Sequence, residues 1–86
     1  MAKHRSHPNI IVRLKRAEGH VRSIVVMIEK GRPCLDLAQQ LHAVEAAIAK
    51  AKTELIHDHI EHCLEDGRSS DVKTALREMK QLAKYL

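Results

Sequence analysis

Aromatic residues are nearly absent from this 86-residue chain, which has no tryptophan, no phenylalanine and a single tyrosine, Tyr85. A core built without large rings must consist of aliphatic side chains. A domain of this length buries only roughly 60 to 70% of its unfolded surface by itself. We therefore expect one domain whose burial is completed by association of several copies.

Long apolar runs are also lacking. No segment approaches the roughly 20 apolar residues that a membrane helix requires, and the N-terminus is basic and histidine-rich rather than signal-like. We expect a cytoplasmic protein with no membrane partner. Cys34 and Cys63 are its two cysteines, and in a reducing compartment they favour metal or thiol chemistry over a structural disulfide.

Charge is present but unevenly divided. Residues 1–32 carry eight lysines and arginines against two glutamates, whereas residues 33–66 carry two lysines against seven acids. The last twenty residues carry a formal charge of +3. The basic first segment is a candidate surface for a polyanion, with a solvated helix face as the alternative.

Apolar residues recur with helical spacing in three segments. The stripes are Ile10, Leu14, Ala17, Val21, Ile24, Ile28; then Cys34, Leu37, Leu41, Val44, Ile48, Ala51, Leu55; then Val72, Leu76, Met79, Ala83, Leu86. With start signals at Pro8 and Ser69-Ser70 and stop signals at Gly31 and Pro33, they predict helices over about residues 8–30, 34–65 and 70–85, after a flexible arm at 1–7. The fold class is all-α, with no strands.

Gly19 lies inside the first predicted helix, where it costs about 1 kcal/mol relative to alanine. We expect it to mark a close approach of two backbones, and a tolerated defect is the alternative.

Cys34, His59 and Cys63 are the candidate metal ligands. His59 and Cys63 are four residues apart and share one face of the second helix. Cys34 starts that helix, where unpaired amides and the helix dipole favour a thiolate. It lies 25 positions before His59, which is about 37 Å along an unbroken helix. One chain cannot close such a site, so the three residues would have to be shared between two antiparallel copies of the helix.

The middle of the second helix supports this pairing. The midpoint between Cys34 and the His59/Cys63 pair falls in an alanine-rich run at residues 43–51. Small side chains would let two helices cross closely about a two-fold axis. The alternative is that the alanines only raise helix propensity.

The other histidines are less constrained. His4 and His7 belong to the predicted arm, which would either fold over the site and add nitrogen ligands or remain a solvated tail. His57 and His62 point away from the His59/Cys63 face and are expected at the surface. His20 and His42 are expected to be structural or exposed.

Four segments carry a resemblance to a known family. They are RLKRAEGHV at 13–21, GRPCLD at 31–36, QQLHAV at 39–44, and the pair His59 and Cys63. In these, and over nearly its whole length, the chain resembles the copper-sensitive operon repressor family, which also includes nickel/cobalt, formaldehyde and persulfide sensors. The resemblance implies an all-helical homodimer that pairs into a disc-shaped tetramer and binds operator DNA without a helix-turn-helix. It also implies release of the DNA when the inducer binds.

Residue roles follow from the same resemblance. Cys34, His59 and Cys63 match the inducer ligands. The basic DNA-contacting positions correspond to Arg13 and Arg16, with Lys50 where relatives often carry arginine, and the neighbouring Lys15 and Arg22 are further candidates. Phosphate contacts would dominate such binding and make it strongly salt-dependent.

Two departures bear on the inducer. Copper sensors of this family place a tyrosine before the first cysteine and a glutamate in the third helix, and these positions look like Pro33 and Met79 here. The His-rich start and the segment from His57 to Cys63 look most like nickel/cobalt-responsive members, although their usual N-terminal histidine aligns with Ala2. We expect Ni(II) or Co(II), then Cu(I), with Zn(II) as a further candidate.

Other functions remain open at this point. Formaldehyde sensors lack the second cysteine and persulfide sensors lack the histidine, so both are disfavoured. A metal-storage or metal-chaperone bundle would bind metal without salt-dependent affinity for specific DNA. An enzyme is disfavoured, because the chain has no phosphate loop and no paired catalytic carboxylates, although a cysteine and a histidine could in principle act as nucleophile and base.

Overall fold

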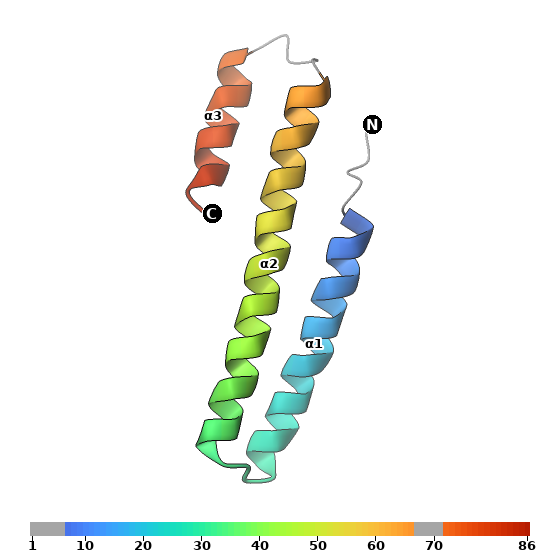
Figure 1. Cartoon of the computed structure of the whole chain (residues 1–86), viewed down its shortest axis with the longest axis vertical. Helices are drawn as coiled ribbons and strands as arrows, with labels where there is room; N and C mark the ends of the chain where they lie inside the picture. Colours follow the sequence, from blue (N-terminus) through green and yellow to red (C-terminus); the bar gives the residue numbers. More distant parts are fainter. Residues whose placement is uncertain (1–6, 67–71) are drawn as a thin grey trace.

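The structure is a computed structural model that describes residues 7–66 and 72–86, with the backbone alone for 62–66. It contains three α-helices, α1 (His7–Glu29), α2 (Cys34–Asp66) and α3 (Val72–Ala83). In Figure 1, α1 and α2 form a long antiparallel hairpin, and α3 lies beside the C-terminal half of α2, on the side away from α1. The described residues form no β-strand, so the predicted all-α, three-helix fold is confirmed.

The turn between α1 and α2 is defined by its backbone hydrogen bonds. Gly31 adopts φ +76°, a conformation that glycine tolerates best. The Gly31 amide donates to the carbonyl of Ile28 and the Arg32 amide to that of Met27, at 3.0 Å each. These two bonds make a Schellman cap that ends α1. The carbonyl of Pro33 then accepts a hydrogen bond from the Leu37 amide, in the first turn of α2, which begins at Cys34. The signals that the sequence shows at Gly31 and Pro33 therefore do end α1 and precede α2, as predicted.

The core of the hairpin uses only part of each apolar stripe, together with Ile56, which lies outside the second stripe. Ile10, Ala17 and Ile24, spaced by seven, are buried on α1, and they pack in the hairpin with Val44, Ala51 and Ile56 of α2. Most of the other large stripe residues stay exposed, and only Leu37 is half-buried; the exposed ones are Leu14, Val21, Ile28, Leu41, Ile48 and Leu55. One chain therefore leaves a second apolar face on each of its two long helices.

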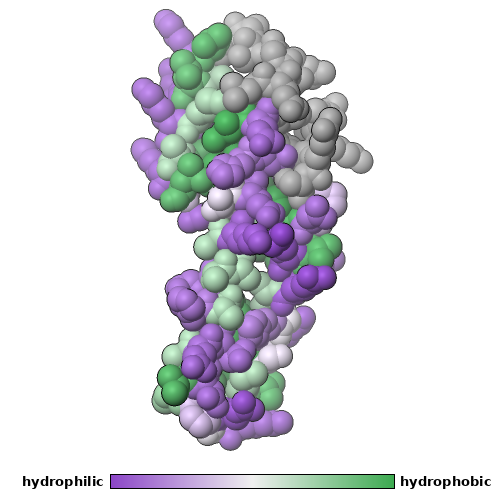
Figure 2. Space-filling model, in the orientation of Figure 1, coloured by the Kyte–Doolittle hydropathy of each residue, from purple (hydrophilic) through white to green (hydrophobic). Residues whose placement is uncertain are grey.

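The molecule is elongated. Its extents are 57 × 23 × 13 Å. The radius of gyration is 17.5 Å, against about 12 Å for a compact domain of this length. Helix α3 has no buried residue, and Figure 2 shows hydrophobic surface over α3 and along α2. None of the helices, over the part of the chain described, is long and apolar enough to cross a membrane.

Gly19 does not mark a close approach within this chain. A Cβ atom built on Gly19 would meet nothing within 4 Å. The expectation of a close backbone contact is therefore wrong for the α1/α2 hairpin itself.

Candidate metal centre and nucleic-acid interface

Cys34 is the first residue of α2, as the sequence predicts, and its free thiol is exposed to solvent. At this position the first amides of the helix have no carbonyl partner in the preceding turn, so the local field favours an anion. The sulfur of Cys34 therefore lies at an accessible end of α2, beside amides that carry no helical hydrogen bond.

Helix α2 is continuous from Cys34 to Asp66. The 25 positions between Cys34 and His59 consequently span about 37 Å. Cys63 belongs to the last turns of α2, and its side chain lies outside the described residues. Among the side chains that are described, no group of three or more histidine, cysteine, aspartate or glutamate residues could hold a metal. A site that uses both Cys34 and His59 requires a second chain.

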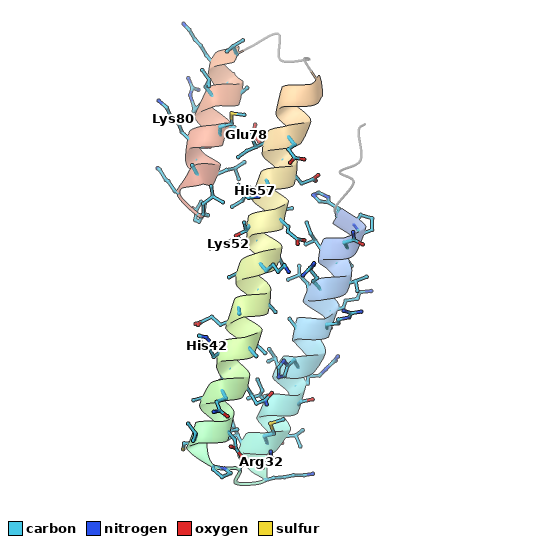
Figure 3. The ribbon with its side chains drawn as sticks, in the orientation of Figure 1. Arg32, His42, Lys52, His57, Glu78 and Lys80 are labelled. Atoms are coloured by element: carbon cyan, nitrogen blue, oxygen red, sulfur yellow. The ribbon has the colours of Figure 1, made fainter. Side chains whose placement is uncertain are left out.

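His59 has a carboxylate partner in α3. Its Nε2 atom lies 2.9 Å from Oε1 of Glu78, and Figure 3 shows Glu78 between α3 and α2. The resemblance placed Met79 at the position where copper sensors carry this glutamate, which predicts no carboxylate partner for His59, and that expectation is wrong. The carboxylate is present one residue earlier. Because Nε2 faces Glu78, the Nδ1 atom of His59 is the candidate nitrogen for a metal.

His7 lies near this pair instead of in an arm, because it is the first residue of α1. Its Nε2 atom is 3.8 Å from Oδ2 of Asp58, whose side chain is only 14% exposed. His7 and His59 line the same cavity of about 200 Å³, together with Leu55, Ile56, Glu78 and Leu82. The structure thus brings His7 to the predicted site, whereas His4 lies outside the described residues.

Two basic residues of α1 lie beside a different part of α2. Arg13 and Arg16 line a second cavity of about 210 Å³ with Ala17, His20 and Ala47. The guanidinium of Arg13 lies 3.3 Å from Oε1 of Glu54 in α2. Lysines 15 and 50 are exposed, and Arg22 lies 3.8 Å from Glu18 on its own helix. Of the predicted DNA-contacting residues, Lys15, Arg22 and Lys50 therefore lie on the exposed helix surface. Arg13 and Arg16 lie beside a cavity between the two helices.

Two other histidines behave differently from each other. His20 Nε2 is hydrogen-bonded to Gln40 Oε1 across the hairpin, so this side-chain contact joins α1 to α2. His42 is exposed and lies 3.9 Å from Glu45 of its own helix. His57 is exposed as expected, and the side chain of His62 lies outside the described residues.

Comparison with known proteins places these features in context. A family model described as metal-sensitive transcriptional repressor matches residues 6–85. The copper-sensing transcriptional repressor CsoR of Bacillus subtilis is 41% identical over 73 residues, which cover 84% of this chain and 72% of that protein. The copper-sensing transcriptional repressor RicR of Mycobacterium tuberculosis is 38% identical over 72 residues, covering 78% of this chain and 75% of that protein.

A solved structure is similar over the whole chain. The nickel-responsive transcriptional regulator InrS superposes with a TM-score of 0.82, covering 100% of this chain and 99% of that one at 26% identity. The relatives at higher sequence identity are thus copper sensors, whereas the similar fold belongs to a nickel-responsive protein.

Proposed function

Since this chain belongs to the family of metal-sensitive transcriptional repressors, we propose that it binds operator DNA without metal and releases the DNA when Ni(II) or Co(II) binds. The metal would be held by Cys34 of one subunit with His59 and Cys63 of another. The protein would act in the cytoplasm, and release of the DNA would switch on genes for metal efflux. A family of transcriptional repressors is not a family of enzymes, so catalysis forms no part of the function.

The exposed apolar row of α2 supports the shared site. Cys34, Leu41, Ile48 and Leu55 are spaced by seven residues along one line of the helix. All four are exposed in the single chain. Leu41 and Leu55 are equidistant from Ile48, so a two-fold axis near Ile48 would pack the row against its own copy in antiparallel fashion. Each Cys34 would then lie beside the other subunit's His59 and Cys63.

The exposed stripe of α1 allows a second association. Leu14, Val21 and Ile28 are as exposed as the α2 row, and they need cover of their own in water. We propose that the dimer formed through α2 pairs again, giving the tetramer that the family resemblance implies.

One observation carries the choice of Ni(II) or Co(II): His7 lines the same cavity as His59. His7 would raise the donor set from two thiolates and one imidazole to four ligands. Nickel and cobalt ions take such mixed nitrogen and sulfur sets, whereas soft Cu(I) is satisfied by thiolates with a single imidazole.

Cu(I) is the second candidate, and the His59–Glu78 contact favours it. A carboxylate on the far nitrogen of a ligating histidine orients the ring and raises its basicity. That coupling is the feature expected of a copper sensor, and the 41% identical relative is copper-sensing. In this case His7 would remain beside Asp58 and take no part in binding.

The DNA partner is supported by charge. Eight of the chain's fifteen basic residues lie in the first 32 positions, and Arg13, Lys15, Arg16 and Arg22 all lie on α1. Phosphate neutralisation by such residues would supply most of the affinity, and operator shape would add specificity in the absence of a recognition helix. Metal would lower the affinity by its preference for the DNA-free state, typically about 1 to 3 kcal/mol.

A mobility-shift titration tests this function. The probe is the DNA upstream of the chain's own gene, with a scrambled duplex as control, titrated with and without Ni(II), Co(II), Cu(I) and Zn(II). We expect specific, salt-dependent binding that Ni(II) or Co(II) reverses at lower free concentration than Cu(I). Reversal by Cu(I) alone would assign the copper alternative, and metal binding without any operator binding would contradict a repressor.

A further inference from the structure

Arg13 is held by a carboxylate of the opposite helix. Its guanidinium lies 3.3 Å from Glu54 Oε1, and the two side chains are 39% and 32% exposed. The pair is therefore partly shielded, and water still reaches both groups. By contrast, no ion pair joins Arg16 to another of the described residues. The two arginines beside the same cavity thus differ in whether an acid already occupies them.

The cavity beside them is suited to an anion. Two guanidinium groups and the imidazole of His20 line it, and its remaining walls are the small side chains Ala17 and Ala47. Arginine binds phosphate oxygens through paired N–H donors. The cationic lining and the absence of bulky walls let a DNA phosphate approach both arginines.

We propose that Glu54 is a regulatory residue that competes with DNA phosphate for Arg13. When Arg13 is bound to Glu54, a phosphate at the cavity meets one arginine and a nearby negative charge. When Arg13 leaves Glu54, the phosphate gains a second donor. The inference rests on the proposed binding of DNA by α1.

Glu54 is placed to respond to the metal site. It lies five residues before His59 on the same helix, about 7.5 Å along the axis. Asp58, one turn beyond Glu54, contacts His7 on α1 at 3.8 Å. Both cross-hairpin ion pairs therefore lie at the end of α2 that carries His59. A ligand that fixes this end relative to α1 changes how firmly Glu54 holds Arg13, and so couples the metal to the DNA.

The test is a double-mutant cycle on metal-free, full-length protein. Glu54→Gln removes the charge and keeps the size of the side chain. Glu45→Gln is the matched control, because Glu45 loses the same charge from the same helix but lies beside His42. Each variant is measured alone and combined with Arg13→Ala, on the upstream DNA and on a scrambled duplex, over a range of salt concentrations.

We expect Glu54→Gln to tighten binding to both duplexes by about two- to fivefold, the range of a partly exposed ion pair. The slope of log affinity against log salt should steepen by about 0.9 for each arginine released to a phosphate. The gain should vanish in the Arg13→Ala background. In a second step Ni(II) is added to the variant with Arg13 intact, and Glu54→Gln should then show a smaller metal-induced loss of operator binding than the wild-type protein.

An unchanged or weaker affinity of Glu54→Gln would overturn the proposal, as would an equal gain from Glu45→Gln or a gain that survives Arg13→Ala. Glu54→Asp keeps the charge but shortens its reach to Arg13, so it should give a smaller gain and serves if the glutamine variant does not fold. Failure of the wild-type protein to prefer the upstream DNA would contradict the proposed function instead, because the scrambled duplex still reports on Arg13.

Discussion

The Nε2 atom of His59 in α2 lies 2.9 Å from the Oε1 atom of Glu78 in α3. This contact connects the candidate ligand to the helix that otherwise packs least against the molecule, since α3 has no buried residue. A metal bound to His59 would therefore affect the position of α3, through Glu78, as well as that of α2.

Glu78→Ala should weaken metal binding by about 10- to 100-fold, the usual cost of removing the hydrogen-bond partner of a ligating histidine. Lys80→Ala, an exposed change on the same helix, should leave the affinity unchanged. Competition titration with a chelator measures both. An equal loss in the two variants would show that α3 matters only as a whole helix.

His7→Ala tests the identity of the metal. We expect the affinities for Ni(II) and Co(II) to fall by about tenfold or more, because removing a ligand should cost no less than removing the partner of a ligand. The affinity for Cu(I) should hardly change, since three donors satisfy it. His42→Ala removes an exposed histidine far from the cavity as the control. Equal effects of His7→Ala on all three ions would contradict a selective role.

Arg16→Ala should weaken DNA binding and lower the salt slope by about 0.9 for each phosphate that the arginine neutralises in the wild-type complex. Lys84→Ala removes one positive charge outside α1 and should change neither quantity by as much. Fluorescence anisotropy with a labelled duplex at several salt concentrations measures both. A slope that falls equally in the two variants would mean that net charge, and not the α1 surface, drives binding.

Ile48→Glu should break the association of subunits, because a two-fold axis near this residue would bring two like charges together in an apolar contact. Sedimentation equilibrium should show monomers, with reduced helix content by circular dichroism. His42→Glu introduces the same charge at an exposed position of α2 and should remain oligomeric. An oligomer unchanged by Ile48→Glu would rule out this row as the interface.

Local signals were enough to predict the helices. The apolar stripes and the Gly31–Pro33 turn predicted elements over about residues 8–30 and 34–65, and the structure has His7–Glu29 and Cys34–Asp66. The signals act within a few residues of each helix end, so they depend little on tertiary contacts. They could not tell which members of each stripe are buried, because buried and exposed members are similarly apolar, and they missed the buried Ile56.

Glu78 was missed for a physical reason of the same kind. It is adjacent to the stripe residue Met79, and the rotation of α3 about its axis decides which of the two reaches His59. That rotation is set by packing between helices, which leaves no local mark on the sequence. The placement of His7 is similar, because only the hairpin brings the start of α1 beside the end of α2.

The central claim is that Cys34 and the His59/Cys63 pair of different subunits form one site. Cys34→Ala and Cys63→Ala should each lose high-affinity metal binding while Cys34→Ala keeps its operator binding. Unfolded and refolded together in equal amounts, the two variants should recover about a quarter of the wild-type sites, since half of randomly formed dimers are mixed and each has one intact site. No recovery in the mixture, or full binding by either variant alone, would contradict a site shared between subunits.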